Sequence, residues 1–342
     1  MLNAENILVH LPNWVGDAVM ATPILRALRL KYPSSKITYI GKPITLQTVG
    51  MKFCDFQISL ESKKIGYILK KASELRKQKF DLGILLPNSL RSAMLFALGR
   101  VKNRIGYKRD GRGFLLNDSI LPPKDSSGNY KPYSAVWYYR DLLEHIDIKC
   151  DSLELEIPTD KNADSQAEKL LLQTGFDSTK KLVMLNPGAS NNFHKRWLPE
   201  RFAQVADNLI EKKSAQVIIN AAPGEEALAK SLEKSMTHKP ILNMADQKNS
   251  IPLLKSLIKK SEVLLTNDTG ARHIAAALGI GVVTIFISTD PIWAQIDCPR
   301  EKIVTINKPF EDCKNDTILH KKFLEGVTVE MVTNAALELW QD

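Results

Sequence analysis

Short apolar runs that alternate with helical patterns constrain the fold of this chain more than any other feature of its sequence. In the first half the apolar runs are 7–11, 36–40 and 82–86, and the helical patterns cover 18–32, 65–77, 90–98 and 135–146. A strand that is apolar on both faces needs helices on both sides of its sheet. The alternation therefore predicts an α/β fold with parallel sheets.

The second half repeats this alternation, so we expect two domains. Its expected strands lie in 181–190, 215–220, 263–267 and 281–287, and its expected helices in 167–173, 199–211, 225–233, 251–260, 271–278 and 329–340. A chain of 342 residues is long for a single core. We place the domains at 1–160 and 161–342, with the last helix a candidate to pack back on the N-terminal domain. A ligand would bind at the carboxyl ends of the strands, in a cleft between the domains.

The positive charge of the chain is concentrated in its first half. Residues 1–150 contain 24 Lys and Arg against 12 Asp and Glu, whereas residues 151–342 contain 23 against 26. A basic half beside a near-neutral half suggests that one domain faces an anionic partner, such as nucleic acid, anionic lipid or a phosphorylated glycolipid. A solvated basic surface is the alternative.

Several features favour a soluble protein in a reducing compartment. No run of about 18 apolar residues could span a bilayer, and the N-terminus lacks the basic segment and cleavage site of a signal peptide. The four cysteines are scattered without the CxxC spacing of a zinc or disulfide framework, at Cys54, Cys150, Cys298 and Cys313. We therefore expect a cytoplasmic protein.

The first motif, PNWVGDAVMATP (12–23), follows the first expected strand directly. Gly16 allows a tight turn or a close approach of the backbone to a ligand. Asp17 lies at the expected helix start, where its carboxylate could accept a proton from an attacking hydroxyl. The alternative role for Asp17 is that of a helix N-cap. The GxGxxG pattern of dinucleotide-binding folds is absent.

The second motif, LTNDTGARHIAAALG (265–279), leads from a strand into a helix. The free N–H groups and the dipole of a helix N-terminus make an anion site that suits a diphosphate. Gly270 leaves room for phosphate oxygens, and Asp268 could orient the loop or the ligand. His273 can point the same way as Thr269, four residues earlier. A capped helix with a surface histidine is the alternative.

Two further motifs of the second half carry charge at strand ends. In NPGASNNFHKRWLPE (186–200), Lys195 and Arg196 could place positive charge on a leaving diphosphate. The alternative is a basic loop with Trp197 packed beneath it. In NAAPGEEALAK (220–230), Glu225 or Glu226 could bind ribose hydroxyls or could simply favour the helix dipole.

The basic excess of the first half gathers in a fifth motif, PNSLRSAMLFALGRVKNRIGYKRDGR (87–112). The motif is either a dock for an acidic acceptor or a soluble basic edge. Its cations are Arg91, Arg100, Lys102, Arg104, Lys108, Arg109 and Arg112. No DxD pattern signals a metal-bound diphosphate, so cationic side chains and helix N–H groups would have to stabilise the leaving phosphate.

Together these motifs resemble those of the ADP-heptose:lipopolysaccharide heptosyltransferases, glycosyltransferase family 9. The resemblance covers nearly the whole chain, and the motifs follow the family's order. WVGDAVMATP (14–23) resembles the N-terminal signature, and LPNSLRSAMLFALGRVKNRIGY (86–107) looks especially like the heptosyltransferase II branch. NPGAS…KRW (186–197) and NDTGARHIAAALG (267–279) are similar to the nucleotide-sugar motifs.

The resemblance implies a GT-B fold of two Rossmann-like domains, the N-terminal one for the acceptor and the C-terminal one for the nucleotide sugar. It implies an inverting, metal-independent transfer of heptose from ADP-L-glycero-β-D-manno-heptose to the lipopolysaccharide inner core, with no cofactor. The basic N-terminal half is then expected to hold the phosphorylated inner core and to contact the inner membrane surface peripherally, and no nucleic acid partner is expected.

Matched residue by residue, the resemblance makes Asp17 the general base and Lys195 the contact to the donor phosphate. The other expected donor-binding residues are Gly16, Ser190, Arg196, Glu225, Asp268, Thr269, Gly270, Ala271 and His273. The expected acceptor-binding residues are Asn88, Ser89, Arg91 and Arg109. No metal ligand is expected.

The sequence departs from the family pattern at WLPE (197–200), NAAPG (220–224) and ISTDP (287–291). These departures leave a family 9 transferase with another donor or acceptor as the first alternative. A second alternative is a non-catalytic protein that binds a nucleotide sugar or nucleic acid in the same cleft. RNA binding would need aromatic stacking platforms that the basic segment largely lacks.

Overall fold

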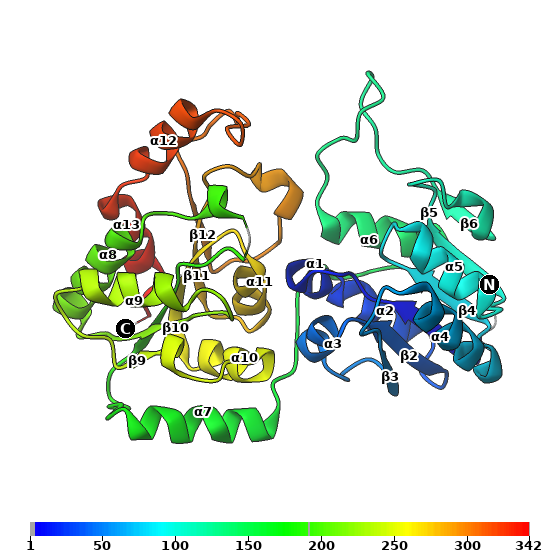
Figure 1. Cartoon of the computed structure of the whole chain (residues 1–342), viewed down its shortest axis with the longest axis horizontal. Coiled ribbons are helices and arrows are strands. Elements are labelled where there is room, and N and C mark those ends of the chain that lie inside the picture. Colours follow the sequence, from blue (N-terminus) through cyan, green and yellow to red (C-terminus); the bar gives the residue numbers. More distant parts are fainter. Residues whose placement is uncertain (1–3, 191, 342) are drawn as a thin grey trace. The chain divides into compact units, whose positions relative to one another are not determined.

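The computed structural model describes residues 4–190 and 192–341. The chain forms two compact units (Figure 1). The first unit runs to Pro158 and also includes Ile292–Asp297, and the second comprises Thr159–Pro291 and the chain from Cys298 onward. Each unit contains a parallel sheet of six strands with helices packed against it.

The sheet of the first unit has the order β3-β2-β1-β4-β5-β6, which is the Rossmann order. Its strands are β1 (Asn6–His10), β2 (Lys36–Gly41), β3 (Phe56–Ser59), β4 (Leu82–Leu85), β5 (Asn103–Tyr107) and β6 (Asp118–Ile120). Its helices are α1 (Val15–Met20), α2 (Thr22–Lys31), α3 (Pro43–Val49), α4 (Ile65–Gln78), α5 (Leu90–Leu98) and α6 (Ala135–Glu144), with a 3-10 turn at Gly113–Leu115.

The central strand β1 shows why residues 7–9 form an unbroken apolar run. Ile7 and Val9 join a core cluster with side chains of α2 and α6, whereas Leu8 joins a second cluster with side chains of α4 and α5. Because successive side chains of a strand point to opposite faces, helices cover both sides of this sheet. The predicted parallel α/β fold is confirmed.

The sheet of the second unit has the order β9-β8-β7-β10-β11-β12, so it repeats the topology of the first. Its strands are β7 (Leu182–Asn186), β8 (Gln216–Ile219), β9 (Leu242–Asn243), β10 (Ser261–Asn267), β11 (Gly281–Ile285) and β12 (Glu301–Val304). Its helices are α7 (Lys161–Gln173), α8 (Pro199–Lys213), α9 (Glu226–Ser235), α10 (Ile251–Lys259), α11 (Gly270–Ala277), α12 (Thr317–Gly326) and α13 (Val329–Leu339). The last helix, α13, packs against α8 and β11 of its own unit (Figure 1).

The single helix expected over 18–32 is wrong, because the segment forms two helices. Ala21 ends α1 and also serves as the N-cap residue of α2. Pro23 lies in the first turn of α2, where a missing N–H costs nothing, and it cannot continue α1. The hydroxyl of Thr22 donates to the carbonyl of Val19 at 2.8 Å and fixes the break. Asp17 therefore lies in a helix of its own.

Each sheet has a point where the strand order reverses, between β1 and β4 in the first unit and between β7 and β10 in the second. Ligands of such sheets bind beyond the carboxyl ends of the strands at this point. Four of the five sequence motifs follow one of these four strands directly. The fold thus places the motifs where doubly wound sheets carry their sites.

Candidate functional site

The first unit has a cavity of about 650 Å³ at the carboxyl ends of its strands. Its walls come from the ends of β1 to β3 and from the start of α5, and they include His10, Trp14, Lys42, Glu61, Ser89 and Arg91. Two of the residues expected to bind the acceptor, Ser89 and Arg91, therefore share one cavity. Ser89 also caps α5 by accepting from the N–H of Ser92 at 3.3 Å.

His10, which the sequence analysis did not single out, is the last residue of β1 and lines this cavity. Its Nδ1 lies 3.0 Å from the carbonyl of Leu11, which can only accept, so Nδ1 carries the proton and Nε2 is an acceptor. Burial, reinforced by the charge of Arg112, lowers the pKa of His10 to about 4. The imidazole is therefore neutral at physiological pH.

Asp17 lies half-buried in the first turn of α1, and Gly16 directly precedes it. The N-cap residue of α1 is Trp14, so the interpretation of Asp17 as an N-cap is wrong. The charge of Asp17 acts on Tyr139 of α6: burial first, and then this charge, raise the pKa of that phenol. Asp17 thus follows β1, at the point where the strand order of the sheet reverses.

Asn88 is held by a buried cation. Its Oδ1 accepts from Arg112 Nη2 at 3.1 Å and from the hydroxyl of Tyr138 at 3.3 Å. Arg112 also donates from Nε to the carbonyl of Tyr107 at 3.0 Å and from Nη1 to that of Pro87. It is fully buried, and burial lowers its pKa to about 10, so it remains a cation at neutral pH. Arg112 therefore supports the loop before α5 and is no part of an exposed basic edge.

Arg109 lies apart from the cavity that Ser89 and Arg91 line. Its guanidinium stacks over the ring of Tyr130 at 3.8 Å. Its Nε lies 3.5 Å from the carboxylate of Asp110. Arg109 lines a second cavity of the first unit, of about 560 Å³. Arg109 also interacts with Tyr138, whose hydroxyl donates to Asn88. It is therefore linked to Asn88, although it lines a different cavity from Ser89 and Arg91.

In the second unit, Asn267 joins the two loops that carry the nucleotide-sugar motifs. Its Oδ1 accepts from the N–H of Trp197 at 2.9 Å, and its Nδ2 donates to the carbonyls of Pro187 and Gly188 at 2.8 and 3.2 Å. Trp197 is buried, and its indole N–H donates to the carbonyl of Val327 at 3.2 Å. The packing of Trp197 is confirmed, and it anchors the loop that presents Lys195.

A chain of alternating charges runs from β12 to Lys195. Lys195 Nζ lies 2.6 Å from Asp268 Oδ2, and the other oxygen of Asp268 lies 3.7 Å from Arg272 Nη1. Arg272 donates from Nε and Nη2 to the two carboxylate oxygens of Glu301, at 2.5 and 2.9 Å. Thr284 donates to the same carboxylate at 2.5 Å. Arg272 is fully buried and Lys195 is partly exposed, so Lys195 is the solvent end of a buried network.

The charges of this network fix the ionisation of Asp268. Burial alone would raise the pKa of this carboxyl, but the opposing charges of Lys195 and Arg272 lower it below its usual range. Asp268 is therefore an anion that draws the Lys195 ammonium to the loop before α11. The sequence predicted both residues in this site but not their contact.

His273 is buried one turn into α11, so the alternative of a surface histidine is wrong. Its Nδ1 lies 3.1 Å from the carbonyl of Thr269, and its Nε2 lies 3.5 Å from Arg272 Nη1. The carbonyl must accept, so Nδ1 donates and Nε2 is the acceptor. Burial and then the charge of Arg272 lower the pKa of His273 to about 4. The neutral ring thereby fixes the first turn of α11.

The first turn of α11 has the geometry of an anion site. Thr269 is its N-cap residue, and no side-chain oxygen caps the turn. Gly270 and Ala271 are its first two residues. N–H groups of an uncapped first turn and the positive end of the helix dipole favour a phosphate. Lys195 donates to the carbonyl of Asp268 at 3.4 Å, directly before this turn.

Glu225, rather than Glu226, contacts the first nucleotide-sugar loop. Its Oε1 accepts from the N–H groups of Ala189 and Ser190, at 3.0 and 2.8 Å, and lies 3.3 Å from Arg196 Nη2. The carboxylate packs so closely on Gly188 that a Cβ there would lie 1.9 Å from it. Ser190 is held at a φ of 49°, a conformation that few side chains adopt. Glu226 instead accepts from the N–H of Gly224 at the surface.

A row of three amides, two of them buried, supports both loops and was not predicted from the sequence. Asn249 donates to Asn220 at 2.9 Å, and Asn220 donates to Asn186 at 2.7 Å. Asn186 donates in turn to the hydroxyls of Thr266 and Thr269, at 2.9 and 3.1 Å. The row crosses the ends of β8, β7 and β10, so it ties Thr269 to the sheet.

The comparisons with known proteins decide the family. The sequence profile of glycosyltransferase family 9 (heptosyltransferase) matches residues 68–322, which is most of the chain. This chain belongs to glycosyltransferase family 9. The family 9 assignment makes it a glycosyltransferase, and the resemblance drawn from its motifs is confirmed.

Relatives of this family 9 transferase are named heptosyltransferases. The chain is 27% identical over 295 residues to lipooligosaccharide heptosyltransferase 2 of Haemophilus influenzae, with 84% of each chain covered. It is 26% identical over 344 residues to lipooligosaccharide heptosyltransferase 2 of Campylobacter jejuni, with 97% of this chain and 98% of the relative covered.

Solved structures share the fold of this family 9 transferase. A family 9 glycosyltransferase from Veillonella parvula has a TM-score of 0.87 at 22% identity, with 98% and 97% of the chains covered. E. coli ADP-heptose LPS heptosyltransferase II has a TM-score of 0.81 at 22% identity, with 98% of each chain covered. The predicted GT-B fold of two Rossmann-like domains is thereby confirmed.

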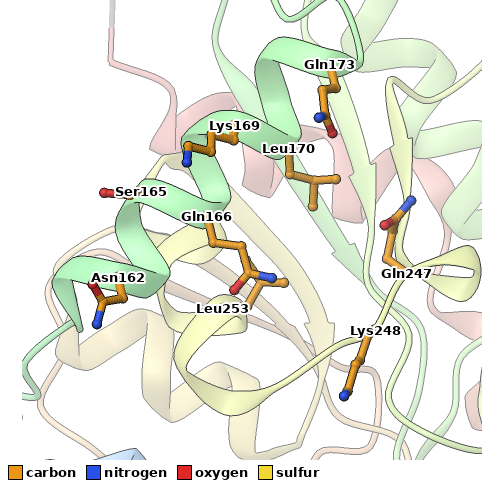
Figure 2. Close-up of a pocket in the computed structure, with 9 residues that line it drawn as sticks. All are labelled: Asn162, Ser165, Gln166, Lys169, Leu170, Gln173, Gln247, Lys248 and Leu253. Atoms are coloured by element: carbon orange, nitrogen blue, oxygen red, sulfur yellow. The ribbon is translucent and has the colours of Figure 1, made fainter.

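A polar cavity of about 490 Å³ in the second unit of the transferase involves none of the predicted site residues. Figure 2 shows its lining side chains, which come from α7 on one side and from the segment 247–253 on the other. Most of them are amides and lysines, such as Gln166, Gln173, Lys169 and Lys248. None of the residues that line this cavity belongs to the motif loops.

The described residues contain neither a cluster of metal-binding side chains nor a helix that could span a membrane. Within residues 4–190 and 192–341, no three His, Cys, Asp or Glu side chains group as a metal site requires. Among the helices of the same ranges, none has both the length and the apolar character needed to cross a bilayer.

The buried neutral His273 should make the second unit of the transferase less stable as pH falls. Its folded pKa of about 4 lies below the ordinary 6.5, so the unfolded chain takes up a proton first. The stability that the neutral His273 contributes is fully present above pH 6.5 and is lost as the pH falls from 6.5 towards 4. Between pH 7.5 and 5 we expect a loss of about 2 kcal/mol from this residue.

Urea unfolding of the wild type and of His273→Asn, followed by circular dichroism at both pH values, measures this loss. The wild type should lose about 2 kcal/mol more than the variant between the two pH values. His238→Asn is the matched control, because that side chain is 41% exposed. Equal pH slopes for wild type and His273→Asn would show that the buried ring is not kept neutral.

Proposed function

We propose that this family 9 transferase moves heptose from ADP-L-glycero-β-D-manno-heptose to the inner core of lipopolysaccharide, as a heptosyltransferase of the II type. The proposal rests on one observation above all, the Lys195–Asp268 pair placed beside the uncapped first turn of α11. A cation and free helix N–H groups suit the diphosphate of a sugar nucleotide. The names of the relatives supply the sugar and the acceptor.

The donor half of the proposed mechanism belongs to the second unit. The N–H groups of Thr269, Gly270 and Ala271 and the ammonium of Lys195 take the charge that develops on the leaving ADP. Lys195 donates to Asp268 at 2.6 Å, so donor binding would share this cation between carboxylate and phosphate. We propose that no metal is required, because cationic groups and helix N–H groups already converge where the diphosphate would lie.

Four more residues are proposed to form the nucleotide site, Glu225 by direct contact and the others by fixing the shape of the loops. Arg196 donates to the carbonyl of Ser190 at 2.7 Å and approaches Glu225, so these residues fix the shape of one loop. Glu225 already accepts two backbone N–H groups through Oε1. Its second oxygen remains for a ribose hydroxyl in our proposal. His273 contributes by fixing the turn at Thr269.

The acceptor half belongs to the first unit. In our proposal Asp17 removes the proton from an acceptor hydroxyl, whose oxygen bonds to the anomeric carbon as the bond from that carbon to the ADP oxygen breaks. Attack from the face opposite ADP converts the β-linked donor into an α-linked product. Ser89 and Arg91 line the cavity that would receive the acceptor, and Asn88 is held beside them.

The basic first half supports an anionic acceptor and a peripheral contact with the inner membrane surface. Phosphate groups of an inner core and the headgroups of anionic lipids both attract lysine and arginine. A cytoplasmic location at the inner face of that membrane follows as part of this proposal.

A transfer assay tests the proposed function. Purified protein is incubated with ADP-heptose and a truncated, phosphorylated inner-core acceptor, and mass spectrometry should show the acceptor gain one heptose. Chelator should leave the rate unchanged, and the new linkage should be α by NMR. Other nucleotide sugars are tested in parallel, because the loop ISTDP (287–291) departs from the family pattern. Transfer from another sugar nucleotide alone would refute the donor assignment.

A further inference from the structure

Two loops of the first unit present apolar side chains to solvent. Phe114, in the 3-10 turn after β5, is 78% exposed, and Leu121, directly after β6, is 74% exposed. Tyr130 lies on the return of the loop that begins at Leu121. The three side chains line one cavity of about 560 Å³, so they form one surface, which we call the loop surface.

Cations surround these apolar side chains. Lys108, Arg109 and Lys124 line the same cavity, against a single carboxylate, Asp110, which is engaged by Arg109 at 3.5 Å. The Lys124 ammonium lies 5.6 Å from the centre of the Tyr130 ring. Net positive charge beside exposed aliphatic and aromatic groups is unusual for a surface that only meets water.

Backbone hydrogen bonds hold the loop surface in this form. The N–H of Lys108 donates to the carbonyl of Ile120 at 2.8 Å, and the N–H of Leu115 donates to that of Arg112 at 2.9 Å. Lys124 and Tyr130 form an antiparallel bridge across the longer loop. Figure 1 shows this loop extending from the body of the first unit between β6 and α6. The hydrogen-bonded backbone thus keeps the apolar side chains exposed to solvent.

We propose that the loop surface docks the protein on an anionic lipid bilayer. Phe114 and Leu121 would enter the interface between headgroups and acyl chains, and Tyr130 would lie at headgroup level. Lys108, Lys124 and Arg109 would meet the lipid phosphates. The choice of a membrane rests on this charge complementarity, and the inference rests on the proposed function because the acceptor there is a glycolipid.

Sedimentation with lipid vesicles tests the docking. The full-length protein should bind vesicles of phosphatidylglycerol and phosphatidylethanolamine, and bind phosphatidylcholine vesicles far more weakly. Phe114→Ser/Leu121→Ser should lower partitioning by about ten-fold or more. Lys124→Gln alone should lower it by about five-fold, with a smaller effect at high salt.

Leu172→Ser/Ile318→Ser is the matched control, because these side chains are 72% and 84% exposed on the second unit. This control should bind vesicles like the wild type. An equal loss of vesicle binding in the two double variants would overturn the proposal. Undiminished vesicle binding by Phe114→Ser/Leu121→Ser would also overturn it. Light scattering is measured alongside: a dimer that the loop variant dissociates would show that a second copy, not lipid, covers the surface.

Activity separates this inference from the proposed function. Phe114→Ser/Leu121→Ser should transfer sugar to a soluble, delipidated acceptor at the wild-type rate but act more slowly on acceptor embedded in vesicles. Wild-type protein that is active on the soluble acceptor but never binds anionic vesicles would refute the docking alone. Wild-type protein that binds vesicles but transfers no heptose would refute the proposed function alone.

Discussion

Replacement of Asp17 by Asn is expected to lower turnover by about 100- to 10,000-fold while the affinity for ADP stays nearly unchanged. The amide keeps the size of the side chain but cannot take a proton from the acceptor hydroxyl. Asp17 lies in the first turn of α1, and Trp14, not Asp17, is the N-cap residue. The loss of the carboxylate should therefore affect the reaction more than the stability of the helix.

Single-turnover transfer from ADP-heptose and calorimetric titration with ADP measure the two parts of this prediction. Glu61→Gln is the matched control, because Glu61 is a carboxylate that lines the cavity at His10 and could compete for the role of base. Lys195→Met is the opposite control and should weaken ADP binding, since Lys195 lies beside the proposed phosphate site.

Three outcomes would contradict the role of Asp17. A loss of ADP affinity as large as the loss of rate would make Asp17 a binding or structural residue. A large loss of rate in Glu61→Gln but not in Asp17→Asn would move the base to Glu61. Retention of more than about a tenth of the wild-type rate by Asp17→Asn would show that no base acts at this position.

The sequence predicted the central strands well and the outer strands poorly, for a physical reason. Strands such as β1 and β4 are buried on both faces, so their residues form unbroken apolar runs. The outer strands β3 and β12 each have one unpaired edge, and half of their residues are polar, such as Gln57 and Lys302. These strands contain no long unbroken apolar run, so the sequence pattern did not distinguish them from loops.

Motifs that follow different strands could be expected to meet, because parallel strands of one sheet end at the same edge. Lys195 and Asp268, 73 residues apart, therefore fall together in the second unit. The contacts that support them could not be predicted in this way. Arg112, Arg272 and Glu301 are buried charges. The residue type alone does not show whether a charged side chain is buried and paired or exposed to solvent.

Replacement of Glu301 by Gln is expected to destabilise the second unit by about 3–5 kcal/mol, the usual effect of breaking a buried ion pair. Glu301 accepts from Arg272 Nε and Nη2 at 2.5 and 2.9 Å, and Arg272 is fully buried. The amide would remove the carboxylate nearest to Arg272, and Asp268 lies farther away, at 3.7 Å. Urea unfolding at pH 7.5, where His273 is neutral, measures the loss.

Two controls separate this buried pair from an ordinary surface one. Lys302→Gln breaks the neighbouring Lys302–Glu338 pair, whose side chains are 43% and 60% exposed, and should cost no more than about 1 kcal/mol. Arg272→Met/Glu301→Leu removes both buried charges and should recover most of the stability, because apolar side chains of similar size need no counter-charge. A cost below about 1 kcal/mol for Glu301→Gln would refute the role of the network.

The reaction should report the same change, because Glu301 acts on Lys195 only through Arg272 and Asp268. When Arg272 loses its partner, Asp268 is drawn towards it, and Lys195 loses the carboxylate that holds it before α11. We therefore expect Glu301→Gln to raise the KM for the sugar nucleotide several-fold more than it lowers kcat, measured at a temperature where the variant remains folded. A purely structural role would lower kcat with the fraction of folded protein and leave KM unchanged. An unchanged KM would show that Glu301 and Arg272 do not influence the position of Lys195, which would then depend on Asp268.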